Sequence, residues 1–210
     1  MRRVFVDPEA PQRDALQEAA KWIRVGGLVA LPTDTLYGLA ADPFQADAVA
    51  RLCAVKGRAE GRALPLIAAD ADQIAARLGP LSPAAVRLAA KFWPGPLTLL
   101  MPAPIALAPD VTGGTRRVGV RVPGHDVARA ICRAADGPVT ATSANRSGQP
   151  ATADPGEVER TLGDDIDLLI DTGPTRGGPP STIVDVTGAV PRLVRAGAVS
   201  WEDIQAWLGD

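Results

Sequence analysis

Apolar residues recur along this chain with two different spacings, which predict a mixture of helices and strands. Leu16, Ala19, Ala20 and Ile23 follow helical spacing, and the glycines at 26–27 end that helix. A second helix has an apolar face at positions 46, 49, 52 and 53 and places Lys56 and Arg58 at its end. Further helices are predicted at 82–91, 126–134 and 157–162 and from residue 200 onward. Short apolar runs predict strands at 4–6, 28–31, 64–68, 97–101, 118–122, 139–142, 168–170, 182–186 and 192–194.

These elements alternate irregularly, because some strands are separated by a helix and others only by a turn. The pattern predicts one α/β domain over residues 1–210, with a core at about 12–200. We expect a mixed, twisted sheet flanked by helices rather than a regular doubly wound fold. Ligands of such sheets bind at the carboxyl ends of strands. Three polar clusters fall there: residues 33–37, residues 143–145 and the loop before Ser181.

Composition narrows the class of protein. Hydrophobic residues make up 46% and charged residues 22% of the 210 residues, the balance of a packed globular protein. With a net charge of −2, the protein could bind nucleic acid only through a local basic face. Cys53 and Cys132 are far apart and are expected to be buried thiols. The N-terminus lacks the apolar stretch of a signal peptide, and no run is long enough to span a membrane, so we expect a cytoplasmic protein.

Several common classes of enzyme are excluded because their sequence motifs are absent. The sequence contains no Walker-type phosphate loop, no G-x-G-x-x-G, no H-E-x-x-H, no C-x-x-C and no G-x-S-x-G. The single histidine, His125, cannot build a zinc site with two badly spaced cysteines, so no protein metal site is expected.

Positive charges at the ends of predicted strands and helices are the remaining candidates for chemistry. Arg117 and Arg121 are four residues apart on one predicted strand and therefore share a face. Such a set suits a polyphosphate ligand, and scattered surface arginines are the alternative explanation. The candidate cations are Lys56, Arg58, Arg62, Arg116, Arg117, Arg121 and Arg195.

Five short segments resemble one known family, in the family's order, across roughly residues 15–200. P-T-D-T-L-Y-G-L at 32–39 resembles the P-T-[DE]-T-x-Y-G-L segment of the YrdC-like domain. K-G-R at 56–58 and S-A-N at 143–145 are similar to its K-x-R…S-x-N signature. The segments at 180–185 and 193–197 resemble its later motifs. The chain resembles the short, TsaC-like type, which lacks the linker and extra C-terminal domain of longer members.

This resemblance implies a threonylcarbamoyl-AMP synthase, which joins L-threonine, bicarbonate and ATP, with Mg²⁺ accompanying the nucleotide, and releases pyrophosphate. The product would pass to proteins that transfer the threonylcarbamoyl group to tRNA. The resemblance implies catalytic roles for Lys56, Arg58, Ser143 and Asn145. It places L-threonine near Thr35, Arg121, Ser143 and Ser181, and ATP near Arg58, Arg62, Arg117, Ala141, Ala151 and Arg195.

Three positions depart from the family pattern. Ala59 stands where many members have proline, Ile67 where some longer members have histidine, and Arg117 where a small hydroxyl residue is common.

Two alternative functions stay open. One is an RNA-binding module without catalysis, which would bind tRNA weakly through the arginine cluster. The other is the carbamoyl-transfer module of hydrogenase maturation, although that module normally sits in a much longer chain with zinc-finger segments.

Overall fold

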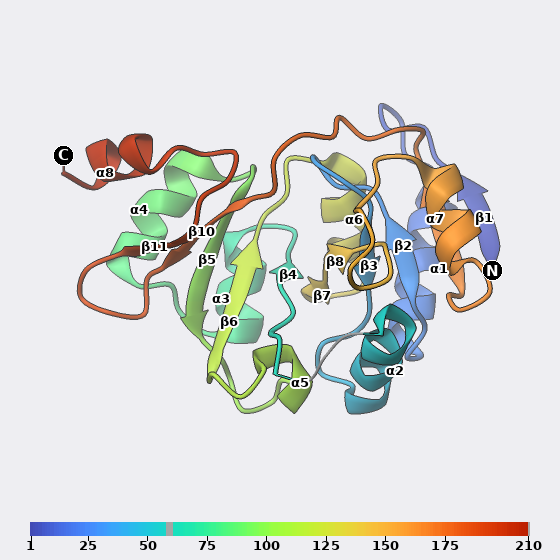
Figure 1. Ribbon diagram of the computed structural model, residues 1–210, viewed down its shortest axis with the longest axis horizontal. Coiled ribbons are helices and arrows are strands. Elements are labelled where there is room, and N and C mark those ends of the chain that lie inside the picture. Colours follow the sequence, from blue (N-terminus) through green and yellow to red (C-terminus); the bar gives the residue numbers. More distant parts are fainter. Residues whose placement is uncertain (58–60, 210) are drawn as a thin grey trace.

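The strands pair into two mixed sheets (Figure 1) in the computed structural model, which describes residues 1–57 and 61–209. One sheet has the order β1 (Arg2–Phe5), β9 (Leu168–Asp171), β2 (Val29–Leu31), β3 (Gly38–Ala40) and β8 (Thr142–Ser143). The other has the order β11 (Arg192–Arg195), β10 (Thr182–Asp185), β5 (Leu97–Pro102), β6 (Arg117–Arg121), β4 (Leu66–Ile67) and β7 (Val139–Thr140). Each sheet contains parallel and antiparallel pairs, so the predicted mixed α/β class is confirmed. The strands are divided between two sheets where the sequence suggested one.

The two sheets meet where the predicted strand over 139–142 is divided at Ala141. Before Ala141, β7 pairs with β4 in the six-stranded sheet. After it, β8 pairs with β3 in the five-stranded sheet. Thr140 joins the two sheets, because its Oγ1 accepts a hydrogen bond from the backbone N–H of Ala41 at 2.8 Å. Hydrophobic periodicity could not reveal this division, since it does not specify the partner of each half-strand.

Helices cover both ends of the molecule, and Figure 1 shows α4 and α8 at the opposite end from α1 and α7. The bounds predicted for the helix over 126–134 are confirmed, and Ser82 caps α4 by accepting a hydrogen bond from the N–H of Ala85 at 3.3 Å. Three elements, β3, α3 and the four-residue α5, were not predicted from the sequence. Within the described ranges, no helix has both the length and the apolarity needed to cross a membrane. The helices are α1 (Arg13–Arg24), α2 (Ala46–Lys56), α3 (Ala71–Leu78), α4 (Pro83–Phe92), α5 (Pro109–Thr112), α6 (Asp126–Ala134), α7 (Pro155–Leu162) and α8 (Trp201–Gly209).

Buried apolar side chains form three clusters around this frame. The largest includes residues of both sheets, such as Leu39 of β3 and Val120 of β6, together with Leu52 of α2. A second cluster joins α1 and α6 to the five-stranded sheet. The third joins α4 and α8 to the six-stranded sheet, with Leu88 of α4 fully buried.

Leu88→Ala should destabilise the fold by about 2–5 kcal/mol, because it removes a fully buried side chain and leaves a cavity under α4. Chemical denaturation measures the change. Val86→Ala, on the same helix but 52% exposed, is the matched control and should change stability by less than about 0.5 kcal/mol. Equal effects of the two substitutions would contradict the packing described for α4.

Candidate active site

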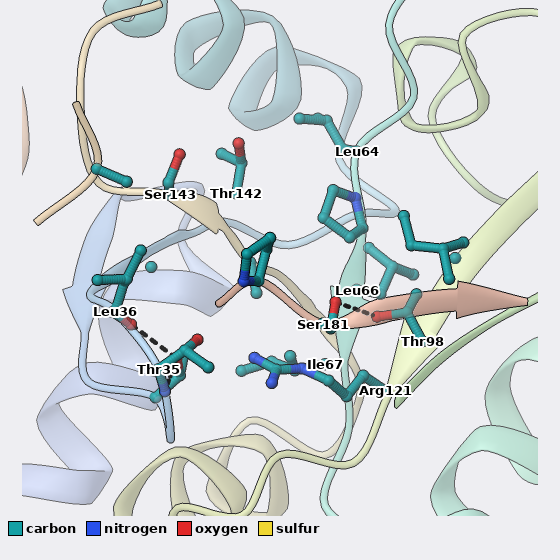
Figure 2. A pocket seen from close by; sticks show the side chains of 18 of the residues that line it. Thr35, Leu36, Leu64, Leu66, Ile67, Thr98, Arg121, Thr142, Ser143 and Ser181 are labelled. Carbon is teal, nitrogen blue, oxygen red and sulfur yellow. Dashed lines mark hydrogen bonds between the residues drawn. The ribbon is translucent and has the colours of Figure 1, made fainter. Parts of the chain in front are cut away.

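A cavity of about 440 Å³ lies between the two sheets, and both contribute side chains to it. In Figure 2 the guanidinium of Arg121 points toward Thr35, while Ser181 and Thr98 lie beside it, hydrogen-bonded to each other. The rest of the wall is largely apolar, including Leu66 and Leu100. An arginine surrounded by hydroxyls and apolar side chains suits a small anionic ligand. The polar lining residues are Thr33, Thr35, Thr98, Arg121, Thr142, Ser143, Ser181 and Arg195.

The turn between β2 and β3 presents Thr35 to the cavity. Thr33 fixes this turn, because its Oγ1 donates to the carbonyl of Leu36 at 2.7 Å and accepts from the N–H of Thr35 at 3.3 Å. The carbonyl of Thr35 accepts hydrogen bonds from the N–H of Gly177 (2.8 Å) and Oγ1 of Thr175 (2.7 Å). Thr35 is therefore held from both sides. The sequence analysis noted this polar cluster but did not single out Thr33.

The segment that supplies those two hydrogen bonds crosses from β9 in one sheet to β10 in the other. The fully buried Tyr37 fixes its start, since its hydroxyl donates to the carbonyl of Gly173 at 2.8 Å and accepts from the N–H of Thr172 at 3.2 Å. The same segment ends at Ser181, on the opposite side of the cavity. One connection thus positions ligand-facing groups on both sheets.

Arg121 ends β6 and is 92% buried, since only 8% of its surface is exposed. Its Nη1 donates to Oδ1 of Asp34 at 2.9 Å. Burial lowers the pKa of the Arg121 guanidinium, and the charge of Asp34 opposes that shift. The sequence analysis predicted the site role of Arg121 but missed its acidic partner, which lies 87 positions away in the chain.

Ser181, Thr98 and Arg195 form a connected group on the six-stranded sheet. Nη2 of Arg195 donates to the carbonyl of Ser181 at 2.7 Å and to its Oγ at 3.2 Å. Oγ of Ser181 lies 2.8 Å from Oγ1 of Thr98. Thr98 was missed, although a lone hydroxyl in the apolar strand L-T-L-L-M was a signal for it. Burial lowers the pKa of Arg195.

Lys56 and Asn145 support the cavity wall and are not among the residues that line it. The buried Nζ of Lys56 donates to the carbonyl of Ser143 (2.5 Å), the carbonyl of Asn145 (2.7 Å) and Oδ1 of Asn145 (3.2 Å). Oγ of Ser143 donates to the same Oδ1 at 2.5 Å. This network fixes the segment over 143–145 so that Ser143 faces the cavity. A direct catalytic role for Lys56 and Asn145 stays a prediction.

The other predicted site residues do not all lie in the cavity wall. Ala141 and Ala151 line the cavity. Arg62 is exposed and lies just before the lining residue Ala63. Arg117 is exposed at the other end of β6 from Arg121 and forms an ion pair with Asp185 at 2.5 Å. Arg58 lies outside the described residues.

Fold and site together define an α/β domain with an arginine-lined cavity between two mixed sheets, and comparisons with known proteins identify its family. The family Sua5/YciO/YrdC, described as "Telomere recombination", matches residues 21–197. The chain belongs to this family.

Named relatives are similar over most of the chain. A threonylcarbamoyl-AMP synthase of Bacillus subtilis is 38% identical over 99% of this chain and 61% of its own length. A putative threonylcarbamoyl-AMP synthase of Mycobacterium tuberculosis is 37% identical over 97% of this chain and 93% of its own. The crystal structure of P. abyssi Sua5 complexed with L-threonine superposes with a TM-score of 0.93 at 35% identity, covering 100% of this chain and 61% of that one. The chain thus spans about three fifths of the B. subtilis and P. abyssi proteins.

Asn145→Ala should destabilise the protein by about 1–3 kcal/mol, because the buried Lys56 and Ser143 Oγ lose their shared acceptor. Urea denaturation measures the change in the free energy of unfolding. Gln149→Ala, which shortens an exposed amide side chain four residues away, is the control and should be nearly neutral. A neutral effect of Asn145→Ala would show that the Lys56 network does not hold this wall.

Proposed function

We propose that this chain is a threonylcarbamoyl-AMP synthase that forms threonylcarbamoyl-AMP and pyrophosphate from L-threonine, bicarbonate and ATP. The observation that carries the proposal is the cavity between the sheets, which has one buried guanidinium, a second, more exposed one and a set of neutral hydroxyls. Its likeness to the threonine-bound P. abyssi structure, at 35% identity over the whole chain, supports the choice of amino acid. The names of the relatives support the choice of reaction.

Arg121 is proposed to hold the carboxylate of L-threonine. A guanidinium offers paired N–H donors that match a carboxylate, and the bond to Asp34 uses only one of its nitrogens. Thr35, Ser143 and Ser181 surround the same space and provide hydroxyls that orient the amino group and the carbamate made from it. Because these hydroxyls stay neutral, the proposed site orients the reactants without a titrating histidine.

Arg195 is proposed to face the phosphates of ATP. It reaches the cavity from β11 and, among the described residues, forms no ion pair with an acid, so its charge is available to a polyanion. Arg58, Arg62 and Arg117 are proposed to extend this positive region, with Ala141 and Ala151 beside the nucleotide. Arg117 would have to leave Asp185 or share it to reach a phosphate.

The proposed reaction proceeds in two balanced steps. The threonine nitrogen attacks the carbon of bicarbonate or its dehydrated form, giving a carbamate with loss of water or a proton. A carbamate oxygen then attacks the α-phosphorus of ATP, and pyrophosphate leaves. Both reactants of the second step are anionic, so guanidiniums in a largely apolar cavity lower its barrier by stabilising the developing charge.

Mg²⁺ is proposed to arrive with ATP rather than to occupy a site made by the protein. The polar groups that line the cavity are hydroxyls and guanidiniums, and guanidiniums do not bind a cation. Within the described ranges, no group of three or more His, Cys, Asp or Glu side chains is placed to hold a metal ion. When bound, Mg²⁺ would neutralise charge on the phosphate oxygens.

The product is proposed to pass, in the cytoplasm, to proteins that transfer the threonylcarbamoyl group to tRNA. A non-catalytic RNA-binding module is the alternative that exposed arginines support, because Arg116 and Arg117 are exposed at the start of β6 and Arg192 is exposed at the start of β11 in the same sheet. Salt-sensitive tRNA binding without consumption of ATP would favour that alternative.

Pyrophosphate release by the purified protein should require L-threonine, bicarbonate and ATP together. A coupled assay with Mg²⁺ measures the rate, and the omission of each substrate in turn provides the controls. The carbamate cannot form without the amine or the carbon source, so either omission should abolish release. Equal release without threonine would refute the synthase proposal and indicate hydrolysis of ATP to AMP and pyrophosphate instead.

Arg121→Met and Arg195→Met should weaken the binding of different substrates. Arg121→Met should weaken L-threonine binding by about 1.5–3 kcal/mol, roughly 10- to 150-fold, because a charged hydrogen-bonded contact is lost. Its ATP affinity, measured without threonine, should change little. Arg195→Met should show the reverse. Calorimetry on both variants decides the assignment, and the opposite pattern would exchange the two subsites.

A further inference from the structure

The carboxylate of Asp34 contacts the guanidinium of Arg121 but is not among the residues that line the cavity. The side chains of Asp34 and Arg121 are only 13% and 10% exposed, and Nη1 of Arg121 donates to Oδ1 of Asp34 at 2.9 Å. Asp34 therefore acts on a ligand in the cavity through Arg121.

The backbone around Asp34 is fixed on both sides. Thr33 closes the turn through the carbonyl of Leu36, and the carbonyl of Thr35 is held by Thr175 and Gly177. Gly124 lies beside the carboxylate, because a Cβ added there would be in ordinary van der Waals contact with Asp34, 3.5 Å from both its Cβ and its Oδ2. The carboxylate is thus held in a braced turn, which limits the orientations that the Arg121 guanidinium can take.

The electrostatic settings of the two cavity arginines differ. Arg121 is buried and paired with an acid, so the pair carries no net charge. Arg195 is exposed, and among the residues that the structure describes it forms no ion pair with an acid. A neutral pair with free N–H donors favours a ligand that carries one negative charge and matches the geometry of those donors. An uncompensated guanidinium favours a ligand of high charge.

We propose that Asp34 is a positioning and selectivity residue, which aims Arg121 at a single carboxylate and keeps polyphosphate away from this arginine. The nucleotide phosphates are then left to Arg195, so the two anionic substrates do not compete for one arginine. Selectivity arises because Asp34 repels a highly charged ligand more strongly than a monocarboxylate. The inference rests on the proposed function, since it takes L-threonine as the ligand of Arg121.

The test is calorimetric titration of L-threonine into wild type, Asp34→Asn and Asp34→Glu, each with and without saturating inorganic tripolyphosphate. Asp34→Asn keeps the size of the side chain but removes its charge, so threonine affinity should fall about 10-fold. Tripolyphosphate should leave threonine binding to the wild type unchanged and should compete with threonine in Asp34→Asn. Asp34→Glu keeps the charge but displaces the carboxylate, so threonine affinity should fall without competition.

Asp136→Asn removes the acid of an exposed pair with Arg77, neither of which lines the cavity, and serves as the matched control. It should leave both titrations unchanged, and thermal unfolding of all variants reports on folding. Threonine affinity within twofold of wild type in Asp34→Asn, or a loss without competition by tripolyphosphate, would overturn the inference while the proposed function stands. Absence of threonine binding to the wild type would instead overturn the proposed function, and the inference with it.

Discussion

The structure depends on one backbone constraint: a single residue, Ala141, separates a strand of one sheet from a strand of the other. Thr140 pairs with Leu66 in the six-stranded sheet, while Thr142 pairs with Leu39 in the five-stranded one. Hydrogen bonds between Thr140 and Ala41 join the sheets at this point. The sheets are therefore tied together at one edge, and their facing surfaces enclose the cavity.

The placement of the polar groups follows from this frame. Backbone atoms at strand ends lack ladder partners, so side chains and neighbouring turns complete their hydrogen bonding. The turn at 32–37, the segment at 143–145 and the start of β10 all lie at such ends, and each presents a hydroxyl to the cavity. Several groups that the family signature contains, among them Lys56 and Asn145, stabilise these ends from behind.

Charge is distributed unevenly across the cavity, because only one of its two arginines is paired with an acid among the described residues. Asp34 compensates the more deeply buried guanidinium, which reduces the cost of taking Arg121 out of water. Arg195 is more exposed and can remain without a nearby acid among the described residues, because water still reaches part of it. The depth at which each arginine lies thus sets whether it needs a partner.

The amino-acid sequence by itself determined the mixed α/β class, most of the longer helices and strands, and the residue types at the cavity. Those features depend on periodicity, capping and motifs within short stretches of chain. Only the tertiary structure decided that the strands form two sheets and that Arg121 pairs with Asp34, 87 positions away, and Thr98 with Ser181, 83 positions away. Such pairs could not be read from local patterns, because they depend on which strands pair and in what register, and that choice is made by the packing of the whole chain.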